Sequence, residues 1–388
     1  MSARFVRLAG LVTLSCLAAA AVVTGQAAQA PPAAEPPAPK MAAPIRQEDL
    51  PQRKRAAGPV NARDYRAPRT AWGDPDIGGV YSSSDESGIP FERPAEFEGR
   101  TLDSFTPAEL AAIVKQRQEQ TIQRAPTLSE FPGATSPMHW FEFYNAGNSR
   151  AWLVTDPKDG RIPPTTPEAD ARAAARTAAR RGRGPADSWT DRSLWDRCIT
   201  RGIPTSMLPT LYGNSYFINQ SPDAVTITYE MVHDTRVIPL EPRPHVGGTI
   251  RQYLGDARGH WEGDTLVVET TNFTDRTAYR GSSEHLRMVE RFRRAGPQTL
   301  EWSVTFDDPH TWTRPWTFTM NLTQGDDSQQ PFEYGCHEGN YGLRNILTAA
   351  RTDDRTAAAA AARGEARPAQ AVELSEEEEA AAGRPARR

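Results

Sequence analysis

Cysteine is scarce in this chain, with three in 388 residues, and no two of them are spaced as Cys-x-x-Cys. The His-x-His and His-Glu-x-x-His patterns are also missing, which excludes a zinc motif built from neighbouring residues. Gly-x-Ser-x-Gly, the P-loop and Gly-x-Gly-x-x-Gly do not occur either. The sequence therefore carries none of the short signatures of α/β-hydrolases, P-loop proteins or dinucleotide-binding folds.

Long apolar runs are absent outside the first residues of the chain. There, Arg4 and Arg7 precede an apolar run from Leu8 to Val23, and the small residues Gly25 and Ala27 follow. This layout is typical of a secretory signal, because the run is short and Ala-rich for a membrane span. We expect residues 1–27 to be a signal peptide, with an uncleaved anchor as the alternative. The mature protein is then exported, periplasmic or secreted, with no membrane span.

Charge of one sign is not concentrated either, since the formal net charge is -4 and the basic residues, almost all Arg, are scattered. A run between Arg172 and Arg183 is the exception. Nucleic-acid binding needs a basic face that follows the phosphates. Nucleic acid is therefore not an expected partner.

Cys198 and Cys336 are the two cysteines that remain once the signal is removed. In an exported chain two cysteines most simply form one bridge, so a disulfide is predicted. Two buried free thiols are the alternative.

Low-complexity segments bracket the part of the chain that can form a core. Residues 28–70 are rich in Ala, Pro and charge, which predicts a linker, and residues 351–388 form a polyalanine and acidic tail predicted to be disordered. One β-rich domain is expected between them, over residues 71–350. Within it, Thr106-Pro107-Ala108-Glu109 and Thr166-Pro167-Glu168 are typical helix starts, which predicts one or two N-terminal helices.

Strict alternation of apolar and polar residues begins near position 215. The apolar members of four such runs are Val225, Ile227, Tyr229 and Met231; Leu286 and Met288; Leu300, Trp302, Val304 and Phe306; and Trp316, Phe318, Met320 and Leu322. Such alternation marks half-buried antiparallel strands. In the segment GHWEGDTLVVETTNF, the turn residues Gly259, Gly263 and Asp264 lead into an apolar run, which indicates a hairpin. The predicted fold is mainly β, an antiparallel meander that forms a lipocalin-like barrel or a sandwich.

Six segments together resemble the signatures of a family of exported bacterial proteins to which no function is assigned. They are RCITRGIP, EMVHDTRVIPL, GDARGHWEGDTLVVETTNF, RGSSEHL, TWTRPWT and YGCHEGNYG. The resemblance spans roughly residues 72–350. It implies a family identity and brings no catalytic residue with it.

Histidines beside carboxylates are the candidates for chemistry, because a His held by a carboxylate is a common general base or metal ligand. His233 continues the alternation that ends at Met231, so it is predicted to point into the barrel beside Arg236. His337 and Glu338 follow Cys336 directly. We expect His233, His337 and Glu338 to be catalytic if the protein is an enzyme. The alternatives are a structural histidine for His233 and a loop held only for structural reasons by the disulfide for His337 and Glu338.

Several further residues are predicted to bind a ligand. Arg236 suits an anionic or carbonyl group, because guanidinium presents paired donors. Trp312, Arg314 and the following Trp316 suggest an Arg stacked between indoles, and the Gly-rich loop around Cys336 brings candidates to a pocket mouth. The full set is Arg236, His285, Trp312, Arg314, Asn340 and Tyr341.

Two functions remain open at this point. The first is a binding protein that holds a small, partly apolar molecule in a barrel cavity with a few polar groups. The second is an acid–base enzyme, an isomerase, lyase or hydrolase, on the same barrel. No cofactor is expected, and a metal ion is left open.

Overall fold

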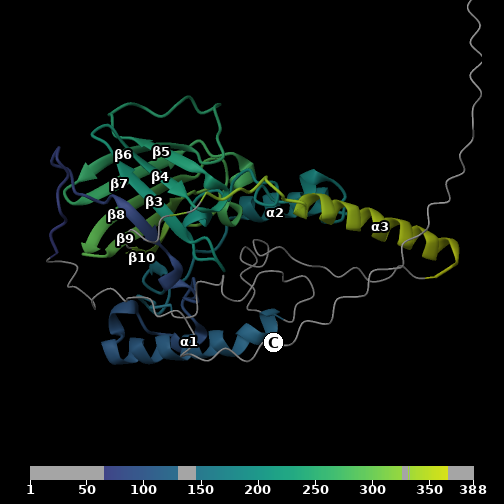
Figure 1. The fold of residues 1–388 in the computed structure, drawn as a ribbon, viewed down its shortest axis with the longest axis horizontal. Coiled ribbons are helices and arrows are strands. Elements are labelled where there is room, and N and C mark those ends of the chain that lie inside the picture. Colours follow the sequence, from purple (N-terminus) through teal and green to yellow (C-terminus); the bar gives the residue numbers. More distant parts are fainter. Residues whose placement is uncertain (1–64, 130–145, 326–330, 332, 366–388) are drawn as a thin grey trace, which may run out of the picture. The chain divides into compact units, whose positions relative to one another are not determined.

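The structure is a computed structural model that describes residues 65–129, 146–325, 331 and 333–365. The predicted signal peptide and all but six residues of the predicted linker lie outside these residues. Ten strands form one antiparallel sheet, ordered β5-β4-β3-β1-β10-β9-β8-β7-β6, with β2 paired to β10 (Figure 1). The strands are β1 (Gly79–Ser82), β2 (Val154–Asp156), β3 (Ser215–Gln220), β4 (Ala224–Tyr229), β5 (Thr235–Pro239), β6 (Asp256–Glu262), β7 (Thr265–Thr271), β8 (Arg287–Gly296), β9 (Thr299–Asp307) and β10 (Trp316–Gln324). The prediction of a mainly β, antiparallel barrel-like fold is confirmed.

The barrel nearly closes where the two edge strands, β5 and β6, meet without a hydrogen-bonded ladder. A Cβ atom at Gly259 on β6 would lie 2.8 Å from Cγ2 of Ile238 and 2.9 Å from Cδ2 of Leu240. The missing side chain therefore lets these two residues pack across the seam. Gly259 was expected in a turn, and that expectation is wrong. It pairs with Val268 inside the hairpin, and the tight turn begins at Gly263, whose φ is +61°.

The barrel interior is filled by the apolar residues that the alternation predicts. Trp302, Phe306 and Phe318 are fully buried, and their rings pack against one another at centroid distances of 5.3 Å for Trp302–Phe318 and 6.0 Å for Phe306–Phe318. On β8, β9 and β10 buried positions alternate with partly exposed ones over most of each strand. Burial of these large rings is the main source of stability in such a fold.

Three helices accompany the sheet: α1 (Pro107–Ser129), α2 (Pro167–Ala179) and α3 (Gly342–Ala362). Both predicted helix starts are confirmed. Thr106 and Glu109 cap each other's backbone N–H groups, and Thr166 accepts a hydrogen bond from the Ala169 N–H. Helix α3 runs past the predicted domain end at residue 350 and includes the whole polyalanine run, residues 357–362. No helix in the described part of the chain is long and apolar enough to cross a membrane.

Candidate binding site at the barrel mouth

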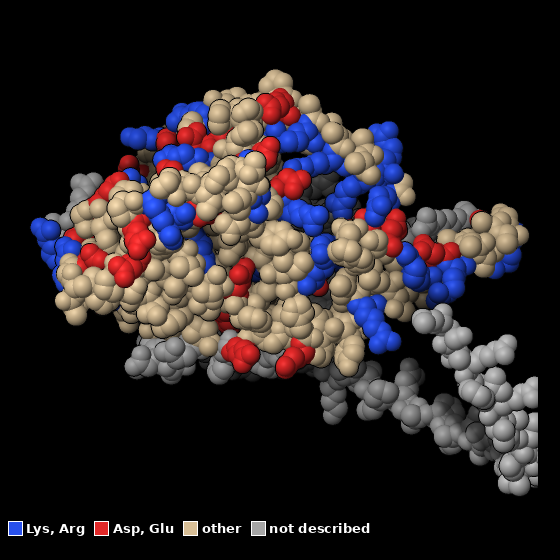
Figure 2. All heavy atoms as spheres, turned by 90° about the horizontal axis from the view of Figure 1, so that it is seen from above, with Lys and Arg blue, Asp and Glu red and all other residues tan. Residues whose placement is uncertain are grey.

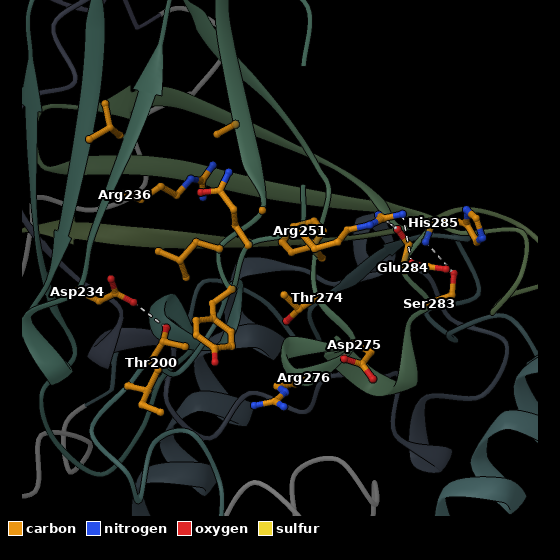
Figure 3. Close-up of a pocket in the computed structure, with 18 of the residues that line it drawn as sticks. Thr200, Asp234, Arg236, Arg251, Thr274, Asp275, Arg276, Ser283, Glu284 and His285 are labelled. Carbon is orange, nitrogen blue, oxygen red and sulfur yellow. Dashed lines mark hydrogen bonds and ion pairs between the residues drawn. The ribbon is translucent and has the colours of Figure 1, made fainter. Parts of the chain in front are cut away.

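A cavity of about 1200 Å³ lies where β5, β6 and β8 begin and β7 ends. These strand ends meet at one edge of the antiparallel sheet, so the loops beside them come together there. Side chains of α2 and Thr200 add to its wall. We call it the mouth cavity (Figure 3).

Charged side chains of both signs line the mouth cavity. The basic ones are Arg172, Arg176, Arg236, Arg251 and Arg276, and the acidic ones are Glu168, Asp234, Asp275 and Glu284. On the face shown in Figure 2, Lys and Arg side chains gather around a hollow with Asp and Glu between them. A cavity with both charges offers complementary positions to a polar molecule.

Some of these charges are already paired and others are not. Arg251 lies 3.2 Å from Glu284, and Arg172 lies 3.5 Å from Glu168. Within the described ranges, the side chains of Arg176, Asp275 and Arg276 make no hydrogen bond or ion pair. These three side chains are therefore available to a bound molecule.

Arg236 forms the inner wall of the cavity and belongs to the barrel interior. Its guanidinium pairs with Glu290, which also accepts a hydrogen bond from the Trp302 indole at 3.1 Å. Burial lowers the pKa of Arg236, but the Glu290 carboxylate and the Tyr229 hydroxyl together raise it by more, and the net shift is upward. For the neighbouring Tyr229, burial has the opposite effect and raises the pKa of the hydroxyl, because the charged form is an anion. Arg236 is thus a permanent cation whose charge Glu290 balances.

His285 lies at the rim of the same cavity. Its ring stacks on His310, with 4.4 Å between the ring centroids, and Nδ1 of His310 lies 3.0 Å from Oε2 of Glu168. Ser283 Oγ accepts a hydrogen bond from the His285 backbone N–H and donates one to Asp308, which fixes the turn that carries the ring. A carboxylate, two imidazoles and an open cavity therefore occur together.

His233 does not point into the barrel, and the prediction of its orientation is wrong. Strand β4 ends at Tyr229, and Val232 and His233 have φ values of +66° and +47°, so the chain turns before β5. The His233 side chain is exposed, and its Nδ1 lies 2.8 Å from the Tyr334 carbonyl oxygen. It lies near the disulfide and is not among the residues that line the mouth cavity with Arg236.

The predicted disulfide between Cys198 and Cys336 is confirmed. The loop that follows it is exposed, and His337, Glu338 and Tyr341 do not line the mouth cavity. Asn340 places its amide 3.2 Å from the sulfur of Cys198. The structure thus does not bring this loop to the cavity with Arg236.

The expected stack of an arginine between two indoles is also wrong. Trp312 and Trp316 are both buried and contact each other directly, with ring centroids 5.4 Å apart. Arg314 is exposed and lies 3.2 Å from Asp156. Trp312 belongs to the core, and Arg314 makes a surface ion pair.

Of the predicted ligand-binding residues, Arg236 and His285 line the mouth cavity. Sequence reasoning missed Arg176, Arg251 and Arg276, which come from a helix and two loops without a shared motif. Arg176 lies in the basic run from Arg172 to Arg183, which was the one available signal.

Comparison with protein-family models, with curated proteins and with solved structures gives no significant match for this chain. Among the residues that the structure describes, no group of three or more His, Cys, Asp and Glu side chains is arranged to hold a metal ion. The function has to be inferred from the mouth cavity itself.

Proposed function

We propose that the protein is exported and binds a small, polar molecule in the mouth cavity of its lipocalin-like barrel. The observation that carries this proposal is the set of unpaired charged groups, Arg176, Asp275 and Arg276, on the wall of a cavity of about 1200 Å³. Unpaired charges at one site contribute little to folding, whereas a ligand with complementary groups gains from them. The apolar residues Leu254, Ala257 and Phe273 on the same wall suit a less polar part of the molecule.

Native mass spectrometry of the full chain, purified from its own host, tests this proposal. A bound molecule adds a mass that disappears on denaturation. Thr274 lies in the cavity wall (Figure 3), so Thr274→Trp should place a bulky ring in the binding space and abolish the added mass. Thr226→Trp, on β4 and outside the cavity lining, should keep it. Retention of the added mass in Thr274→Trp would place the ligand elsewhere.

An acid–base enzyme is the second candidate function, and the His285–His310–Glu168 arrangement favours it. Glu168 can orient His310, and His285 presents an imidazole at the rim of the cavity. His285→Gln separates the two functions. An enzyme that loses its base retains substrate, so the added mass changes from that of the wild type, whereas a binding protein carries the same molecule in both forms.

A further inference from the structure

A second cavity, of about 890 Å³, adjoins the mouth cavity and shares Thr200 and Arg276 with it. We call it the flanking cavity. Six arginines line it: Arg180, Arg192, Arg197, Arg201, Arg276 and Arg280. Its charge therefore differs from that of the mouth cavity, where acidic and basic residues are nearly balanced.

Two carboxylates also line the flanking cavity, and both already have arginine partners. Asp191 accepts hydrogen bonds of 2.9 and 2.7 Å from Arg183, and these keep the pKa of its carboxyl below the usual value. Asp196 lies 2.9 Å from Arg192. Neither carboxylate has to be displaced for an anion to enter.

Three of the arginines keep an uncompensated charge. Over the ranges that the structure describes, no carboxylate lies within 4.0 Å of Arg197, Arg276 or Arg280. The guanidinium carbon of Arg197 lies 4.6 Å from the ring centroid of Trp189, and that of Arg280 lies 4.3 Å from Phe91. An aromatic ring on the face of a guanidinium fixes its plane and leaves N–H groups at its edge for an oxyanion.

We propose that the flanking cavity is an anion-binding site that takes a doubly charged oxyanion group, a phosphate or a sulfate, on Arg197, Arg276 and Arg280. Arginine binds such groups through paired, charge-assisted hydrogen bonds. Thr190 and Thr205, which also line the cavity, provide hydroxyl donors. The proposal does not depend on a ligand in the mouth cavity, because Arg197 and Arg280 line the flanking cavity alone.

Isothermal titration calorimetry with sodium sulfate and sodium phosphate at pH 8 tests this site, with sodium acetate at matched ionic strength as the control. We expect saturable binding of sulfate or phosphate and none of acetate. Tighter binding of phosphate identifies a phosphate ester as the natural group, and tighter binding of sulfate identifies a sulfate ester.

Variants of the full chain decide where the anion binds. Arg197→Gln and Arg280→Gln should each weaken binding about 10-fold or more, since each removes hydrogen bonds to a charged group. Arg291→Gln, at a surface arginine of β8 paired with Glu262, should bind like the wild type. Absence of saturable binding, or equal affinity in the wild type, Arg197→Gln and Arg280→Gln, would overturn the proposal.

Discussion

Arginine side chains in the barrel interior and at the barrel mouth differ in whether a carboxylate balances their charge. In the interior, Arg236 is buried and held by Glu290, and the Trp302 indole satisfies the same carboxylate. At the mouth, Arg176 and Arg276 are exposed and lack an ion-pair partner among the described residues. A buried charge must be compensated for the chain to fold, but an exposed one need not be. The interior arginine therefore serves the fold, whereas Arg176 and Arg276 at the mouth are free to serve binding.

Among the variants that test this difference, Arg236→Gln is expected to change the free energy of unfolding most. The substitution leaves the buried carboxylate of Glu290 without its cation, which should lower the free energy of unfolding by about 3–5 kcal/mol. Urea denaturation followed by tryptophan fluorescence measures the loss. Replacing Arg236 and Glu290 together by Met should recover most of it, because no uncompensated charge is then buried. A loss below about 1 kcal/mol in Arg236→Gln would show that the pair contributes little to the fold.

The next largest loss of stability is expected from a substitution at the seam between β5 and β6. In Gly259→Ala the new methyl group meets Ile238 and Leu240 at less than 3 Å, and we expect a loss of about 1–3 kcal/mol from overpacking. Gly247→Ala is the matched control, since no atom lies within 4 Å of its Cβ position. Equal stability of the two variants in urea would show that the seam is not tightly packed.

Glu86 predicts a pH dependence of stability. Burial raises the pKa of its carboxyl, although Arg150 and hydrogen bonds from Ser149 act in the opposite direction. A raised folded-state pKa gives stability that is complete below the unfolded value of 4.5 and is lost as pH rises through the folded value. Relative to Glu86→Gln, the wild type should therefore become less stable from pH 4 upward. A difference in melting temperature that stays constant from pH 4 to pH 8 would refute this.

The smallest effect on stability is expected from Arg276→Gln. Because this side chain is exposed and unpaired within the described structure, its replacement should change the free energy of unfolding by less than about 0.5 kcal/mol. The same urea experiment as for Arg236→Gln gives the comparison. A loss of 2 kcal/mol or more, as expected for a buried pair, would erase the distinction between mouth and interior.

Features of the fold that depend on neighbouring residues could be predicted from the sequence, whereas features that depend on distant segments could not. The alternation of Trp302, Val304 and Phe306 with polar residues predicts the buried face of β9, so the fold class could be predicted from a few residues. The prediction that Arg236 lies at the cavity agrees with the structure, in which its side chain points inward from β5. The prediction that His233 points inward as a continuation of β4 does not. The turn at Val232 and His233 separates the two strands, and neither residue type signals a positive φ.

The mouth cavity could not be predicted in the same way. Its walls combine Arg176 from α2, Arg251 from the chain before β6 and Arg276 from the chain after β7. Only the closure of the barrel brings these segments together, and no spacing in the sequence records it. The stacked pair of His285 and His310 differs, because the two residues flank the β8–β9 hairpin, whose outermost pair is Arg287 and Asp307.

The most direct test of the account is whether a small molecule occupies the mouth cavity. Native mass spectrometry of the full chain from its own host should show the same bound small molecule in the wild type and in Arg197→Gln, and the mass of that molecule should be lost in Thr274→Trp. Persistence of that mass in Thr274→Trp, or no bound small molecule in the wild type, would contradict the proposal that the barrel mouth binds a small polar molecule.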